Sequence, residues 1–393
     1  MRGRKLITIL AMMFACNAVF AQQTISYEEA NAKSYALYEK GEWKALLQYG
    51  RQYMAQSPDF VLLRLRMGYA AFMLNNFSEA LAQYDAVLKK DSYNETAHYY
   101  SWLCRKYLNQ SELADVHMKY FSKEALQKEK IQNFTITKIG TEVSYKSTPL
   151  TARGNSIYAR MDLHTRLHRN INMQHGFALY NQTIAEPKFA AVTNNTNIPI
   201  NQKEYYNKTT INLNRQWQII GACHYLYTPF NNFTYNNHIG LAGVKYSNYY
   251  FAIQADAVLG KMTDTALQQY NATLSLYPLG NLNIYSFSTS SLRNRNGKSA
   301  FNFKQVIGFK AMKFLWLEGN ATFGSFSNFV ENDALYLYNA IDANKIKAGA
   351  TAYITITSKI TAQTGYTFEQ RELYKSINTF NQHSITGGIS CKF

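Results

Sequence analysis

The chain has few cysteines, few prolines and no apolar run long enough to form a membrane-spanning helix. Among its 393 residues are four cysteines and six prolines. Three of the cysteines follow residue 21, an odd number without metal-like spacing, so a disulfide framework or a metal site is not expected. The apolar run at residues 6–14 is shorter than the about 20 residues that a spanning helix needs. A membrane crossing must therefore use β-strands.

Residues 1–21 have the pattern of a secretory leader. Three basic residues precede the apolar run, and the small residues Ala18 and Ala21 end the segment. This order predicts cleavage after Ala21 and export of the mature chain. A lipid anchor on Cys16 is the alternative, but the residues before Cys16 fit such a site poorly.

Acidic residues are also scarce, and the imbalance lies in the C-terminal part. The chain has 41 Lys and Arg against 25 Asp and Glu, a net charge of +16. Residues 22–132 are nearly balanced, whereas residues 133–393 carry 24 basic and 12 acidic side chains. This excess favours contact with anionic headgroups or anionic cargo. An exported protein is not expected to have nucleic acid as its partner.

A 34-residue period in residues 22–132 predicts a helical repeat domain. Trp43, Phe77 and Ser111 are 34 residues apart, and Leu46, Ala80 and Ala114 follow the same spacing. The pattern resembles two to three tetratricopeptide repeats, which stack helix pairs into one core. Either a protein partner binds the concave surface or the domain is a spacer packed on a barrel mouth. The residues that define the repeat are Trp43, Leu46, Gly68, Phe77, Ala80 and Ala114.

Beyond Gln132 the hydrophobic period changes to two. In residues 157–168 the odd positions are almost all apolar, and most of the even positions are charged or His. This alternation suits a wall between lipid and an aqueous lumen. The predicted fold class is therefore a short helical repeat domain followed by an antiparallel transmembrane β-barrel at residues 133–393.

The alternation predicts about fourteen strands, or twelve if two weak pairs merge. We number the connections between strands from the first strand onward. The longest connections, residues 184–204 and 327–344, then have odd numbers, whereas the tight turns have even numbers. Long outer loops and short periplasmic turns are typical of outer-membrane barrels. The predicted strands are 134–147, 155–168, 171–183, 205–215, 217–228, 235–246, 249–259, 265–277, 281–290, 300–310, 314–326, 345–357, 359–371 and 380–393.

The last strand ends on an aromatic residue. Ile385, Ile389 and Phe393 share one face of it. This ending resembles the signal that the barrel assembly machinery reads, so Phe393 is the expected contact with that machinery. The barrel is expected in outer-membrane lipid, with the repeat domain in the periplasm.

Charged side chains on the opposite faces of the strands are the candidate lumen lining. They could bias ion passage, or they could form salt bridges that fill a narrow lumen. The candidates are Arg160, Asp162, His164, Arg166, His168, Lys347, Lys359 and Arg371.

The sequence gives little reason to expect an enzyme. His164, His168 and His175 lie near Asp162 and could form an acid–base or metal site. A polar lumen stripe explains them better, and no phosphate loop or nucleophile elbow is present. We therefore expect no catalytic residue, metal or cofactor.

The leader, a repeat with the Gly-Glu-Trp loop at residues 41–43, and a Tyr- and Asn-rich barrel ending in Phe393 together resemble the YaiO family of outer-membrane barrels. The resemblance implies an outer-membrane location but no substrate. The first hypothesis is a non-enzymatic transport or secretion component, with a glycan as one candidate cargo. A closed structural or adhesion barrel that works through its outer loops is the second, and a lipid- or glycan-modifying enzyme is the third.

Overall fold

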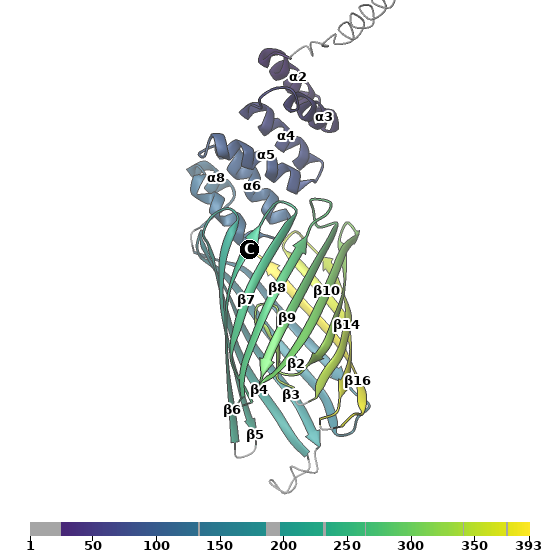
Figure 1. Cartoon of the computed structure of the whole chain (residues 1–393). Helices are drawn as coiled ribbons and strands as arrows, with labels where there is room; N and C mark the ends of the chain where they lie inside the picture. The colour runs from purple at the N-terminus through teal and green to yellow at the C-terminus, as the bar shows by residue number, and fades with distance from the viewer. Residues whose placement is uncertain are drawn as a thin grey trace, which may run out of the picture.

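A computed structural model describes residues 25–132, 134–185, 197–230, 233–263, 265–340, 342–374 and 376–393. Within these residues, a stack of short helices is followed by one closed β-barrel (Figure 1). The expected leader at residues 1–21 lies outside the described residues, as does much of the expected loop 184–204. The predicted fold class is confirmed, with fourteen barrel strands rather than twelve.

The helices repeat at the predicted period. Helix starts at residues 27, 61 and 95 alternate with starts at residues 43, 77 and 111, each set 34 residues apart. The elements are α2 (Tyr27–Glu39), α3 (Trp43–Met54), α4 (Val61–Met73), α5 (Phe77–Lys90), α6 (Glu95–Tyr107), α7 (Ser111–Ala114), a 3-10 helix (Asp115–Tyr120) and α8 (Lys123–Lys128).

The core of the helix stack uses the small and apolar residues that recur in the sequence. Leu46, Ala80 and Ala114 are fully buried. The small side chains of the two alanines let neighbouring helices approach closely. Gly68 lies against the ring of Tyr84, because a Cβ at residue 68 would be 2.7 Å from that ring. The third pair is short: α7 has four residues and continues as a 3-10 helix.

Fourteen antiparallel strands form the barrel, and each pairs with its sequence neighbour in the wall. The first and last close the cylinder through ten paired positions from Lys138 to Ser147. The strands are β1 (Thr135–Ser147), β2 (Arg153–His168), β3 (Ile171–Ala185), β4 (Asn197–Asn212), β5 (Trp217–Phe230), β6 (Phe233–Ser247), β7 (Phe251–Met262), β8 (Thr265–Leu276), β9 (Ile284–Arg295), β10 (Lys298–Met312), β11 (Leu315–Phe326), β14 (Ala343–Thr355), β15 (Ile360–Glu372) and β16 (Thr379–Lys392).

Every predicted strand overlaps one observed strand, with two differences. Strand β4 begins at Asn197, eight residues before the predicted start, because its polar first half pairs with β3 despite Pro199. Between β11 and β14, the predicted loop contains a short hairpin, β12 (Phe329–Glu331) and β13 (Tyr336–Tyr338), outside the barrel wall.

The outer face of the wall is apolar and carries aromatic rings near both rims. Close to the helices, Trp217 and Phe314 are about half exposed. At the other rim, Tyr145, Phe301 and Phe323 are exposed to a similar extent. Two such girdles around an apolar band are typical of barrels that span a membrane.

An arginine on this outer face should destabilise the barrel. Met161 lies near the middle of β2 with 51% of its surface exposed outward. Met161→Arg should lower the free energy of unfolding by about 2–4 kcal/mol, because the charge would enter lipid. His164→Arg, on the inner face of the same strand, is the matched control and should cost much less. Urea unfolding in lipid vesicles measures both. Equal costs would contradict the assignment of faces.

Candidate functional site

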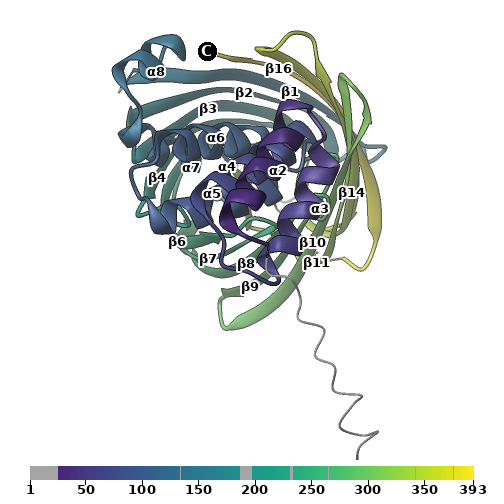
Figure 2. The same ribbon diagram turned by 90° about the horizontal axis from the view of Figure 1, so that it is seen from above.

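The helix stack lies across one mouth of the barrel (Figures 1 and 2). The amide of Ser78, at the start of α5, donates to the carbonyl of Gly280 at 3.0 Å. Its hydroxyl donates to the carbonyl of Tyr249 at 2.6 Å. Asn212 donates to the carbonyl of Glu112 at 2.6 Å. These contacts join α5 and α7 to the barrel rim and its short turns.

Ion pairs reinforce this cover at its edge. Arg166 of β2 lies 3.1 Å from Asp115, and Arg215 lies 3.3 Å from Asp85 of α5. Burial raises the pKa of Asp115 to about 6, against the attraction of Arg166. Arg105 is fully enclosed and donates to the carbonyl of Arg215 at 2.7 Å. The polar groups that hold the helix stack on the barrel are therefore largely removed from water.

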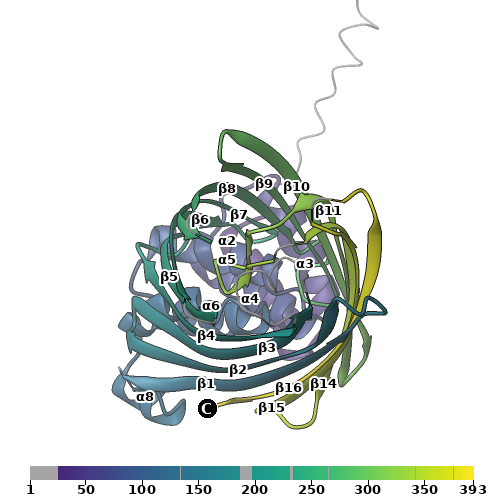
Figure 3. The same cartoon turned by 90° about the horizontal axis from the view of Figure 1, so that it is seen from below.

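A second cover comes from the opposite end. The chain between β11 and β14, described for residues 327–340 and 342, turns back into the lumen, and we call it the inner hairpin (Figure 3). Arg153 fixes its base by a paired contact to Asp342, at 2.7 and 3.1 Å. Phe326, directly before the inner hairpin, and Phe329, within it, are both buried.

One side of the inner hairpin bonds to the wall strands β4 to β8. Lys208 pairs with Asp333 at 3.0 Å, and Gln254 donates to the same carboxylate at 2.7 Å. The side chain of Gln269 both accepts from and donates to the backbone of Val330, at 3.1 and 2.7 Å. The tip of the hairpin is therefore held at several points.

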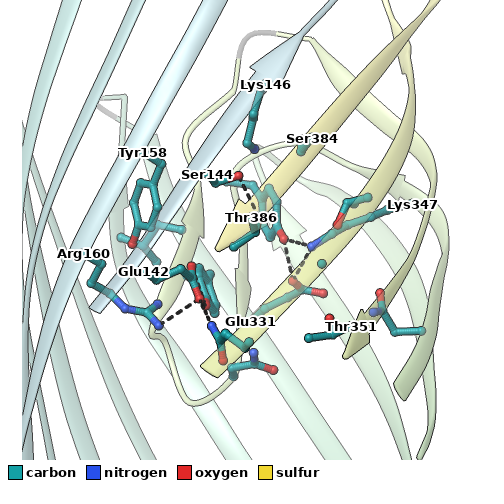
Figure 4. Close-up of a pocket in the computed structure, with 18 of the residues that line it drawn as sticks. Glu142, Ser144, Lys146, Tyr158, Arg160, Glu331, Lys347, Thr351, Ser384 and Thr386 are labelled. Carbon is teal, nitrogen blue, oxygen red and sulfur yellow. Dashed lines mark hydrogen bonds and ion pairs between the residues drawn. The ribbon is translucent and has the colours of Figure 1, made fainter. Parts of the chain in front are cut away.

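The other side faces β1, β2 and β14 (Figure 4). Glu331 lies 3.1 Å from Lys347 and 3.5 Å from Lys304. The hydroxyl of Tyr336 donates to Glu142 at 3.1 Å, and its ring lies 4.6 Å from the guanidinium of Arg160. The acidic hairpin thus neutralises basic side chains of the lumen.

The hairpin turn holds an unfavourable backbone conformation. Asn332, Asp333 and Ala334 have φ angles of 52°, 55° and 65°. Left-handed conformations in residues other than glycine cost of order 1–3 kcal/mol where strained, and Ala lacks the side chain that helps Asn and Asp there. The contacts of Asp333 and the bond between His224 and the carbonyl of Ala334, at 2.7 Å, offset that cost.

Two cavities remain in the lumen. One, of about 400 Å³, lies between the hairpin and β1, β2 and β14 to β16. The other, of about 710 Å³, lies between the hairpin tip and the loop after α6, with Leu108 and Asn109 in its wall. We call the larger one the helix-side chamber.

The predicted lining residues lie in the lumen, against the helix stack or at the exposed rim. Arg160 and Asp162 face the lumen 2.9 Å apart, and His164 follows on the same face. Lys347 and Arg371 also face inward and pair with Glu331 and Glu369. The sequence is compatible with either a lining that biases ion passage or salt bridges that fill the lumen. The charged residues among these form salt bridges.

The remaining three lie at the helix-side end of the barrel. Arg166 contacts the helix stack rather than open water. His168, the last residue of β2, is exposed, and Lys359 is exposed in the turn before β15. Neither His168 nor Lys359 lies deep in the lumen.

The histidines considered as an acid–base or metal site are not together. His164 faces the lumen, whereas His175 bonds the hydroxyl of Tyr205 on the outer face. Within the described residues, no group of three or more His, Cys, Asp or Glu side chains could hold a metal ion. None of the helices in those residues is long and apolar enough to cross a membrane.

Apart from Asp162, sequence reasoning missed the acidic partners of the lumen. Glu142 lies on β1, and Glu331, Asp333 and Asp342 belong to the inner hairpin. A signal was present, because three of the few carboxylates in residues 133–393 occur within twelve residues of a single long connection.

Removing the rim arginine should loosen the helical cover. Arg166→Gln leaves the buried Asp115 carboxylate without its ion-pair partner, which typically costs about 3–5 kcal/mol. Hydrogen exchange should then speed up in residues 111–120. Lys359→Gln removes a charge from an exposed turn and should change nothing. Unchanged protection in Arg166→Gln would show that the ion pair does not hold the cover.

Acid should destabilise the third helix pair. Nδ1 of His98 lies 2.9 Å from Nδ1 of His117, and burial lowers the pKa of both. Their contribution to stability is present above the ordinary pKa of about 6.5 and is lost as pH falls below it. Hydrogen exchange of residues 95–120 at pH 8 and pH 5 should show this loss. The loss should shrink in His117→Leu, and an equal loss there would exclude the histidines as its cause.

Comparisons with known proteins find resemblances of shape only. No family model matches the chain, and no curated protein does. The CymD monoaromatic hydrocarbon channel matches with a TM-score of 0.46 and 4% identity, over 67% of this chain and 90% of that one. A bacterial polysaccharide outer membrane secretin matches with a TM-score of 0.39 and 10% identity, over 66% of this chain and 98% of that one. The toluene transporter TodX of Pseudomonas putida matches with a TM-score of 0.42 and 6% identity, over 70% of this chain and 90% of that one. The resemblances to the YaiO family and to tetratricopeptide repeats stay predictions.

Proposed function

We propose that the chain is an outer-membrane transport barrel whose lumen is closed at rest by two covers. The apolar exterior, the two aromatic girdles and the polar interior support a barrel in lipid. The leader pattern at residues 1–21 supports export. The exposed Phe393, with Ile385 and Ile389 on the outward face, supports delivery to the barrel assembly machinery.

The helix stack is assigned to the periplasmic side. It sits at the end where short turns join the strands, as between Arg169 and Asn170 or at Ser358. Short turns in such barrels are periplasmic and long connections are external. In this orientation the inner hairpin belongs to an outer connection that folds inward.

The charge match between hairpin and lumen carries the proposal. Asp333 and Glu331 are held by Lys208, Lys304 and Lys347 across distances of 3.0 to 3.5 Å. These polar contacts can be exchanged for water or for an anionic cargo. The hairpin also buries Val330 and Ala334 against apolar wall residues, and exposing that surface adds to the cost of opening. We infer that the hairpin is a gate whose ion pairs determine when this apolar contact is released.

The outer part of the helix stack is assigned to a periplasmic protein partner. Helices α5 to α7 contact the barrel, but the surface of α2 and α4 carries half-exposed Tyr27, Tyr35, Leu62 and Met73. Exposed apolar side chains gathered on a repeat surface favour protein contact. A partner that pulled on this surface could lift the cover from the mouth.

Neutralising the hairpin should open the barrel and make it prefer anions. The double variant Glu331→Gln and Asp333→Asn is made in the Arg166→Gln background, so that the helix stack also loses its rim ion pair. In it, three lumen lysines lose their carboxylates. Single-channel conductance in planar bilayers should rise above that of the unaltered chain. Anions should pass preferentially, less so at high salt because the Debye length is about 10 Å at 0.1 M.

Glu372→Gln is the matched control for this experiment. It removes a carboxylate that pairs with Lys345 at the exposed rim, at 3.0 Å, and should leave conductance unchanged. If the double variant stays folded by gel mobility yet does not conduct, the second candidate is favoured: a closed structural barrel, which the two covers also fit.

A further inference from the structure

The helix-side chamber is lined by charged side chains and by an aromatic wall. Its lysines are Lys138, Lys208, Lys245, Lys304 and Lys392. Aromatic rings cluster on neighbouring strands at its helix-facing end, and amide and hydroxyl side chains lie between them and the hairpin. The rings are Tyr277, Tyr285, Phe287, Trp316 and Tyr353.

The rings form a nearly continuous arc along the wall. Trp316 of β11 and Tyr353 of β14 are directly opposite each other in the strand register. Phe287 lies 5.2 Å from Tyr285 and 6.4 Å from Tyr277, measured between ring centres. These two groups are separated only by strand β10, so the arc runs from β14 to the end of β8.

Gly308 of β10 makes the arc possible. A Cβ at residue 308 would collide with the ring of Tyr285. Without it, that ring lies over β10, and its hydroxyl donates to Glu318 on the next strand at 3.1 Å. An aromatic side chain therefore covers this part of the wall.

The carboxylates of the chamber are already engaged. Asp256 accepts from Asn271 and Gln254 at 2.6 and 3.1 Å. Glu318 accepts from Tyr285, while Glu331 and Asp333 pair with lysines. A cationic ligand would have to displace these bonds, so the wall does not favour one.

We propose that the helix-side chamber binds a saccharide. A pyranose ring has an apolar face of C–H groups that packs on aromatic rings, and hydroxyls that exchange hydrogen bonds with amide side chains such as Asn271 and Asn302. The chamber volume of about 710 Å³ lies within the usual range for ligand pockets, about 300–1,000 Å³. A purely apolar ligand would leave the buried side-chain oxygens of Asn302 and Thr322, which lack a hydrogen-bond partner within the described residues, without one.

This inference rests on the proposed transport function, because it names the class of cargo. Direct binding keeps the two claims apart. The full chain in detergent is titrated by calorimetry with maltohexaose, cellohexaose and chitohexaose, and with trigalacturonate and toluene as the anionic and apolar alternatives. At least one of these saccharides, neutral or anionic, should bind more tightly than toluene.

Removing rings from the arc should weaken that binding. Phe287→Ala and Tyr353→Ala should each raise the dissociation constant about tenfold, comparable to the loss when a stacking ring is removed from other aromatic platforms. Tyr353→Phe keeps the ring and should bind nearly as the unaltered chain does. Phe301→Ala removes a ring from the outer face and is the matched control. Heat-modifiable gel mobility verifies that each variant is folded.

The outcomes separate the two claims. Binding of no saccharide, or tighter binding of toluene, overturns the saccharide assignment and leaves transport standing if the neutralised hairpin conducts. Saccharide binding without conduction supports the assignment and counts against transport. Binding that survives both ring deletions places the sugar outside the chamber and overturns the inference.

Discussion

The ion pairs between the inner hairpin and the lumen lysines determine how this barrel can work. A fourteen-stranded wall with a basic interior would repel itself across the lumen, and the carboxylates of Glu331 and Asp333 supply the opposite charge. The same contacts hold three left-handed residues at the hairpin tip. Charge balance, closure of the lumen and local backbone strain therefore depend on one short segment.

The two covers use the same physical chemistry at opposite ends. The helix stack is tied to the short turns by Asp85, Asp115 and the carbonyl of Glu112, and the hairpin is tied to the wall by Glu331, Asp333 and Asp342. In both places the ion pairs join basic side chains of the barrel to carboxylates of the cover. The basic excess of residues 133–393 thus has an intramolecular use, besides any attraction to anionic lipid.

Local patterns in the sequence were enough to predict most of the architecture. Alternation along β2 separated Met161 from Arg160, because each strand has one face toward lipid and one toward the lumen. The 34-residue period predicted a helical repeat, and its residues Trp43, Phe77 and Ser111 prove to be the starts of α3, α5 and α7, because each helix pair packs on the next in the same way. The start of β4 was missed because its polar first half and Pro199 do not alternate.

The arrangement of the lumen could not be predicted in the same way. Which partner Arg160 or Lys347 would find depends on Glu142 and Glu331, which lie 18 and 16 residues away in sequence. That the connection after β11 turns inward also depends on contacts with strands across the barrel, such as those of Gln269 and Gln254. Local periodicity carries no information on such pairings, so the aromatic arc and the two cavities emerge only from the folded chain.

A distance measurement between spin labels tests most directly that the hairpin is a charge-held, reversible gate. Labels at Asn332, in the hairpin tip, and at Lys313, in a turn beside the helix stack, would be introduced with Cys223 and Cys391 replaced by Ser. At low salt we expect one short, narrow distance distribution. At 1 M salt, where the Debye length is about 3 Å, a longer and broader population should appear. A single short distance at every salt concentration would contradict the gate and indicate a permanent plug.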